Sequence, residues 1–266
     1  MENAASNFAA LERFKWFLKV RGARELILNS TKPATDYTKA AVLFLMRERQ
    51  CGELEVLLTK RSYTLPSHAG ENCLPGGMFD AAKDRSLRDT ALREAEEEVG
   101  VRRDLVRVVA ELPPTPSGWT DFMAVTPVVG ILKATIILRL NDEVAEAFWV
   151  PVKFFLGNKY HSTILGRWWS TVTSSDVFDY SDPQGGVDPP VQRTIWGLTS
   201  RICIAASAIA FNRHPEFPYT STFVYDVSVA EHRVVLMQIA LTLEEASQYE
   251  CDTVTVYDTL CTNAKL

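Results

Sequence analysis

The most regular pattern of apolar and polar positions in this chain lies at residues 87–99. An apolar residue recurs there every four positions, at Leu87, Ala91, Ala95 and Val99. This period predicts an amphipathic helix that packs one face against a core. Ser86 followed by Asp89 resembles the capping box at a helix start, and Gly100 stands where a left-handed C-terminal cap is expected.

Shorter apolar runs on both sides of this helix predict strands. They cover residues 40–47, 54–59, 106–112, 123–131, 135–140 and 143–150. The polar residues 48–53 separate the first two runs, which predicts a hairpin. Residues 196–212 form a second, apolar helix. Strands that flank a helix in this order favour an α/β fold, namely an α/β/α sandwich around a mixed β-sheet.

The outer parts of the chain carry other patterns. Residues 6–20 have the period of an amphipathic helix, and residues 221–249 indicate an extra C-terminal helical segment. Residues 157–191 are rich in Ser, Asp, Pro and Gly, and we expect them to form a long excursion beside the functional site. The expected division of the chain is an N-terminal helix and linker at 1–38, a central domain at 39–212 and a C-terminal extension at 213–266.

Composition narrows the class of protein. The chain has 266 residues, of which 47% are hydrophobic and 23% charged, as in ordinary globular proteins. Its formal net charge of -5 argues against a protein that coats nucleic acid. Five cysteines without CxxC spacing predict reduced thiols rather than a zinc site or a disulfide framework. The sequence has neither a recognisable signal peptide nor an apolar run of membrane-spanning length, so we expect no membrane partner.

Three carboxylates gather on one face of the first helix. Glu94, Glu97 and Glu98 stand at i, i+3 and i+4, whereas Glu96 points to another side. Carboxylates this close repel one another unless a cation joins them, and hard divalent cations such as Mg2+ prefer oxygen ligands. An acidic helix is more often a solvated face. The neighbouring motifs therefore have to decide between the two interpretations.

Those motifs resemble a known family. Residues 92–101 read LREAEEEVGV and are similar to the second half of the Nudix box, R-E-apolar-x-E-E-x-G-apolar. Residues 57–62 (LLTKRS), His68, Gly70 and the PGG turn at 75–77 resemble the extra motif of the coenzyme A diphosphatase branch of Nudix hydrolases. The resemblance implies a Nudix sandwich fold with Mg2+ (or Mn2+) as cofactor. It also implies hydrolysis of the diphosphate bond of coenzyme A or acyl-coenzyme A to 3',5'-ADP and (acyl-)4'-phosphopantetheine.

The same resemblance implies a role for each matched residue. Glu94 and Glu98 would bind the metal, and Glu97 would be a third ligand or the base that takes a proton from water. Arg93 would orient these acids. Contacts with the substrate are expected from Arg61, Lys60, Gly76, Gly77 and His68.

Three positions depart from the family pattern. Pro66 replaces an arginine of the branch motif, and Leu74 replaces a phenylalanine. The acid expected six residues after Gly77 falls on Lys83, and the sequence leaves open whether the next residue, Asp84, takes its place. These departures keep two alternatives open. One is a Nudix pyrophosphatase acting on ADP-ribose, NADH or another nucleoside diphosphate derivative, and the other is a non-catalytic Nudix-fold binding module.

The C-terminal region suggests a location. Ala264-Lys265-Leu266 resembles the Ser-Lys-Leu tripeptide that the peroxisomal import receptor reads. We expect the protein in a peroxisome or a peroxisome-like organelle, and otherwise in the cytoplasm. Residues 213–266 either cover the core or form a homodimer contact, and the pattern leaves both open.

Overall fold

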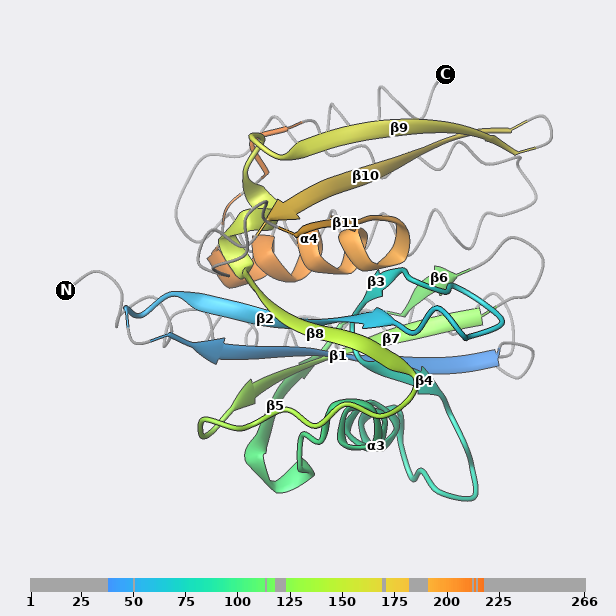
Figure 1. Cartoon of the computed structure of the whole chain (residues 1–266), viewed down its shortest axis with the longest axis vertical. Coiled ribbons are helices and arrows are strands. Elements are labelled where there is room, and N and C mark those ends of the chain that lie inside the picture. The colour runs from blue at the N-terminus through green and yellow to red at the C-terminus, as the bar shows by residue number, and fades with distance from the viewer. Residues whose placement is uncertain are drawn as a thin grey trace, which may run out of the picture.

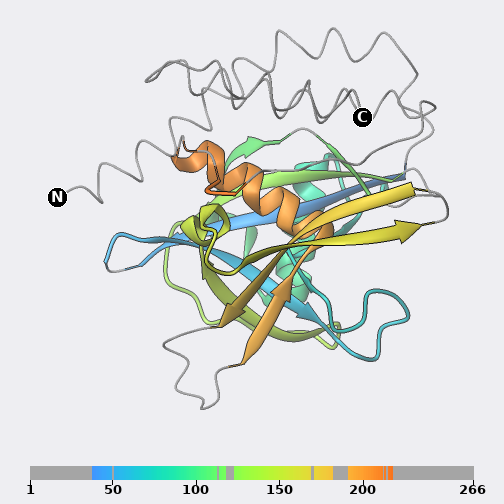
Figure 2. The same ribbon diagram turned by 90° about the horizontal axis from the view of Figure 1, so that it is seen from above.

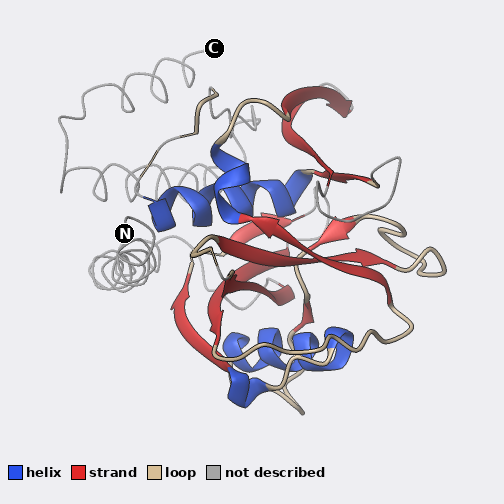
Figure 3. Ribbon diagram, turned by 60° about the vertical axis from the view of Figure 1, so that its left-hand side comes forward, coloured by secondary structure: helices blue, strands red, loops and turns tan. Residues whose placement is uncertain are grey.

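The computed structural model describes residues 38–49, 51–112, 114–117, 123–168, 171–181, 191–211, 213 and 215–217. Its centre is a mixed β-sheet with helix α3 (Leu87–Val99) on one face and helix α4 (Gly197–Phe211) on the other (Figure 1). Figure 3 shows the same two helices on opposite sides of the strands. The predicted α/β/α arrangement is confirmed. The helices expected at 6–20 and 221–249 and the C-terminal tripeptide lie outside the described residues.

The main sheet contains strands from across the first two thirds of the chain. Their bounds are β1 (Thr38–Glu48), β2 (Leu54–Arg61), β3 (Asn72–Cys73), β4 (Gly76–Met78), β5 (Val106–Glu111), β6 (Thr115–Ser117), β7 (Met123–Leu132) and β8 (Val144–Pro151). Within the described residues the order is β3-β2-β1-β7-β5, with β4 on β1, β6 on β7 and β8 on β2. Strands β1 and β7 pair in parallel and β1 and β2 antiparallel, so the sheet is mixed and the expected hairpin is present.

Side chains of the central strands alternate between two cores. On β1, Leu43 and Leu45 pack toward α3, whereas Phe44 packs toward α4. On β2, Leu57 belongs to the α3 side and Leu58 to the α4 side. A strand buried on both faces needs apolar residues at every position, which is why these strands read as continuous apolar runs.

A second sheet packs on the far side of α4. In the described residues it consists of β9 (His161–Trp168), β10 (Thr171–Ser181) and β11 (Gln192–Ile195), all antiparallel (Figure 2). The long excursion expected over 157–191 contains the regular strands β9 and β10, and residues 182–190 lie outside the described residues. Thr, Val and aromatic residues with high strand propensity offset the Ser and Asp content here. Phe178 of β10 is fully buried against α4 and its neighbours.

The strand predicted at residues 135–140 is also absent from the structure. This segment is extended but bonds to the end of α3 instead of a strand: the Arg139 N–H donates to the Val99 carbonyl at 3.0 Å. Ile136 and Leu138 pack against the α3-side core, while Ile137 between them is 88% exposed. The sequence correctly showed the alternation of buried and exposed side chains in residues 135–140. It did not show that the backbone of this segment bonds to α3 rather than to a neighbouring strand.

Two short 3-10 helices, η1 (Arg103–Leu105) and η2 (Val152–Leu156), complete the described elements. No helix among the described residues is both long enough and apolar enough to cross a membrane.

The packing of the second sheet gives a stability prediction. Phe178→Ala should lower the free energy of unfolding by about 3–5 kcal/mol, because it removes a fully buried ring from the α4-side core. Ile164→Ala on β9 is the matched control, since Ile164 is 57% exposed and should change stability by less than about 0.5 kcal/mol. Urea denaturation of both variants measures the difference. Equally small losses of unfolding free energy in the two variants would contradict the burial of Phe178 against α4.

Candidate active site

Helix α3 begins and ends as its sequence predicts. The Ser86 hydroxyl accepts the Asp89 N–H at 3.2 Å. At the other end Gly100 adopts a left-handed conformation with φ 71°, and its N–H donates to the Glu96 carbonyl. These caps fix the helix register, because they satisfy backbone groups that would otherwise lack partners. The acidic residues consequently stand at defined places around the helix.

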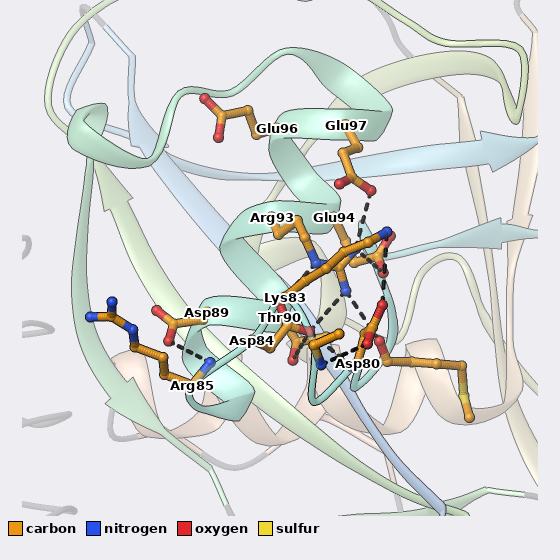
Figure 4. A network of polar contacts seen from close by, with 12 residues as sticks. Asp80, Lys83, Asp84, Arg85, Asp89, Thr90, Arg93, Glu94, Glu96 and Glu97 are labelled. Atoms are coloured by element: carbon orange, nitrogen blue, oxygen red, sulfur yellow. Dashed lines mark hydrogen bonds and ion pairs between the residues drawn. The ribbon is translucent and has the colours of Figure 1, made fainter.

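Arg93 is the centre of a buried polar network (Figure 4). Its guanidinium donates to Asp84 twice, with Nε–Oδ1 at 2.8 Å and Nη2–Oδ2 at 2.9 Å. It also lies 2.8 Å from Glu94 Oε1 and 3.1 Å from Glu97 Oε2. A further contact runs from Nη2 to the Met78 carbonyl at 3.2 Å. Arg93 therefore orients two of the three predicted acids, and all of these contacts hold it inside the protein.

Asp84 supplies the acid that pairs with this arginine. Besides Arg93, it accepts the Thr90 hydroxyl at 2.9 Å and the Asp80 N–H at 3.1 Å. The hydrogen bonds from Arg93 hold the pKa of the Asp84 carboxyl below its usual range. Lys83 is exposed and lies 3.8 Å from Asp80. The question left open by the sequence is thus answered by Asp84, one residue past the expected position.

Glu98 faces inward from the last turn of α3. Its side chain is buried, and Oε2 accepts the Gly76 N–H at 3.2 Å. The pKa of this carboxyl is raised to about 8, chiefly by burial and also by the negative charges of Glu94 and Glu143, while the Gly76 N–H and the charge of Arg61 oppose the rise. A buried carboxyl surrounded by other acids gains from a cation, since the cation removes both the repulsion and the desolvation cost.

The two glycines of β4 make room for this arrangement. A Cβ on Gly77 would lie 2.5 Å from Glu94 Oε1, and one on Gly76 would lie 2.4 Å from the Ala41 carbonyl oxygen. Only glycine therefore lets β4 lie against both β1 and the acidic helix face. The expected contact of these two residues with a diphosphate stays a prediction, and the Gly76 N–H already donates to Glu98.

The donor set fits a divalent cation in its chemistry. Glu94, Glu97 and Glu98 offer only carboxylate oxygens, which suit Mg2+ or Mn2+. Burial raises the pKa of Glu94, and the charges of Glu97 and Glu143 add to the effect against the opposing pull of Arg93. Among the described residues no three His, Cys, Asp or Glu side chains already converge as a ready metal cage.

The predicted substrate contacts divide into separate places. Arg61 ends β2 on the acidic side, and its charge acts on Glu98. Its buried Nε has no hydrogen-bond partner among the described residues. Lys60 is not brought together with Arg61, because adjacent strand residues point to opposite faces. His68 is 70% exposed, with φ 55°, and its Nδ1 lies 3.0 Å from Glu71 in the loop after β2.

Glu143 is a further candidate, because its place before a strand suggests an outlying base or metal contact, and that role stays a prediction. It precedes β8, and its carbonyl accepts the Ser62 N–H at 2.7 Å, which ties the start of that strand to the loop after β2. Its charge acts on both Glu94 and Glu98. Its position just before a strand was visible in the sequence, but its closeness to α3 depends on the pairing of β8 with β2.

Comparison with known proteins shows which family the chain resembles. The profile of the NUDIX domain matches residues 36–165. The peroxisomal coenzyme A diphosphatase NUDT7 of Mus musculus is 36% identical over 171 residues, which cover 62% of this chain and 68% of that protein. The peroxisomal coenzyme A diphosphatase ndx-8 of Caenorhabditis elegans is 34% identical over 181 residues, covering 67% of this chain and 71% of that protein.

This chain belongs to the Nudix family. Nudix hydrolases generally use divalent metal ions, which agrees with the oxygen-only donor set. Another Nudix relative, the chloroplastic Nudix hydrolase 22 of Arabidopsis thaliana, is 39% identical over 182 residues, or 67% of this chain. The chain spans only 57% of the length of that plant relative.

The raised pKa of Glu98 gives a pH dependence of stability. Folded Glu98 keeps its proton up to pH about 8, whereas the unfolded chain releases it near the ordinary value of 4.5. Between these values the folded state binds more protons, so the free energy of unfolding of metal-free protein should fall as pH rises. Thermal melts at pH 5, 6, 7 and 8 in EDTA measure the fall.

The matched variant for this experiment is Glu98→Gln, which keeps the shape and cannot ionise. Its melting temperature should fall less than that of the wild type over the same pH range. Adding Mg2+ should stabilise the wild type most at pH 8 and the variant little, since a cation favours the ionised carboxyl. Parallel pH profiles of the two proteins in EDTA would contradict the assignment.

Proposed function

We propose that this chain is a divalent-metal-dependent Nudix hydrolase acting on coenzyme A or acyl-coenzyme A. It would split the diphosphate bond to 3',5'-ADP and (acyl-)4'-phosphopantetheine. The observation that supports it most is the buried Glu98 carboxyl, packed beside Glu94 at the glycine turn and opposed by Arg61. The named activities of the mouse and nematode relatives support the choice of substrate.

In this proposal each side chain has a separate task. Glu94 and Glu98 hold Mg2+ (or Mn2+), which when bound neutralises phosphate oxygens and lowers the pKa of a bound water. Glu97 is half exposed and held by Arg93, so it is placed either as a third ligand or as the base that accepts a proton from water. Arg93 is a positioning residue, because its hydrogen bonds already go to protein groups. Arg61 offers its charge to the diphosphate.

A second candidate substrate class is ADP-ribose, NADH or a related nucleoside diphosphate compound. Pro66 lies exposed in the loop after β2, where the branch motif has an arginine, so one cation is missing there. Leu74 is buried in the α4-side core, so its replacement of phenylalanine alters packing near the turn. The non-catalytic alternative is disfavoured because the three acids of α3 are all present.

A product assay decides among these candidates. With Mg2+, the wild type should cleave coenzyme A and acyl-coenzyme A faster than ADP-ribose or NADH. Glu98→Gln should lower kcat by at least about a hundredfold, because the change removes one buried carboxylate expected to hold the metal. Glu97→Gln should also lower kcat, and the fold-loss in kcat should exceed the fold-rise in KM. Chromatography of the adenine nucleotide released, 3',5'-ADP from the coenzyme A compounds and AMP from ADP-ribose or NADH, measures each reaction.

Glu96→Gln is the matched control for these variants. Glu96 lies on the same helix but is exposed and pairs with Arg103 at 3.1 Å, so its loss should leave turnover unchanged. Preference for ADP-ribose or NADH would favour the second candidate. Absence of turnover with every compound would favour a binding module.

The proposal extends to location. The names of the mouse and nematode relatives place those proteins in peroxisomes, and the tripeptide Ala264-Lys265-Leu266 resembles an import signal. We therefore propose peroxisomal import through the receptor for such tripeptides.

Microscopy tests this location. A fluorescent protein fused to the N-terminus should co-localise with peroxisomes when the C-terminus is free, and removal of residues 264–266 should leave it in the cytosol. A cytosolic signal from the intact chain would overturn the proposal.

A further inference from the structure

Two adjacent cations at the end of β2 face opposite sides of the main sheet. Arg61 shares its face with Thr59, Cys73 and the Glu98 carboxyl of the acidic site. Lys60 pairs in register with Asn72 on one side and Glu146 on the other, and this row continues the α4-side face of Leu58 and Phe148. The β2–β8 register shifts between Lys60 and Arg61, as at a bulge, which often re-aims side chains beside functional sites.

The neighbours of Lys60 leave its charge available. Glu146 is the acid in register with Lys60, but its Oε1 already accepts the Arg193 Nε–H at 3.0 Å and the Arg193 Nη2–H. Asn72, on the other side, donates its amide to the Thr194 carbonyl at 2.8 Å. Within the described residues no carboxylate lies within ion-pair distance of Lys60. The charge of Lys60 is therefore not neutralised by an ion pair within the described residues.

An aromatic ring holds this cation in place. Lys60 Nζ lies 5.3 Å from the centroid of the Tyr63 ring, within range of a cation–π contact. The Tyr63 ring packs on Gly70: a Cβ added at Gly70 would lie only 2.6 Å from the Cε1 atom of Tyr63. Tyr63 is nevertheless 69% exposed and Lys60 is half-buried, so the ring is open to a ligand and the lysine beside it is partly so. Lys60 and Tyr63 together form what we call the Lys60 corner.

We propose that the Lys60 corner binds the 3'-phosphate of the coenzyme A nucleotide, while Arg61 serves the diphosphate on the other face. The inference rests on the proposed function. A phosphomonoester carries about −1.5 to −2 charges at pH 7, and a lysine ammonium suits it as a compact point charge. One ribose carries both anions, the diphosphate at its 5' position and the phosphate at its 3' position. The nucleotide would thus pass around the end of β2 and be held on both faces.

A comparison of coenzyme A with 3'-dephospho-coenzyme A tests the proposal. Wild-type protein with Mg2+ should show a higher kcat/KM for coenzyme A. Lys60→Met should lower that kcat/KM about tenfold, mainly through KM, as expected for the loss of one charge-assisted contact. The same variant should change kcat/KM for 3'-dephospho-coenzyme A by less than about twofold. Lys60→Arg should retain most of the preference, because it keeps the charge.

Lys159→Met is the matched control. Its Nζ also lies beside a partly exposed tyrosine ring, 4.9 Å from the centroid of Tyr160, but at the start of the second sheet. This variant should act on both compounds like the wild type. Equal losses for both compounds with Lys60→Met, or no loss with either, would overturn the assignment while leaving the proposed function intact. If the wild type cleaves neither compound, the proposed function fails and this inference fails with it.

Discussion

The ion pair between Arg93 and Asp84 is the interaction on which the acidic face of α3 depends. It joins the helix to the loop after β4, and the same guanidinium sets the positions of Glu94 and Glu97. Breaking a buried pair of this kind typically costs about 3–5 kcal/mol, because the remaining charge stays buried without its partner. The buried cation thus neutralises part of the repulsion between Glu94 and Glu97, while Glu98 is held by the Gly76 N–H.

Local chemistry was the part of this molecule that the sequence could predict. Both caps of α3 and its apolar stripe follow from residues within a few positions of one another. The strands of the main sheet that are buried on both faces were visible as apolar runs for the same reason. Each of these signals depends on the period of one element, so no knowledge of distant partners was needed.

The errors arose where the backbone partner lies far away in the chain. Residues 135–140 alternate like a strand, but the Arg139 N–H donates to the Val99 carbonyl at the end of α3. The polar sequence of β9 and β10 hides two strands that are paired mainly with each other. Asp84 lies beside Arg93 because of the conformation of the loop between β4 and α3, which the sequence pattern did not reveal. Strand alternation alone places Lys60 and Arg61 on opposite faces of the sheet. The family motif nevertheless led us to expect substrate contacts from both.

Helix α4 extends the minimal folded domain of this protein beyond the segment that the family profile matches. The family profile ends at residue 165, inside β9, before α4 begins at Gly197. Yet α4 is buried on nearly every side, and it covers Phe44, Leu58 and the other residues on that face of the sheet. A fragment cut at the limit of the profile would expose this whole apolar surface to water. The recognisable catalytic signature is therefore shorter than the autonomous folding unit that carries it.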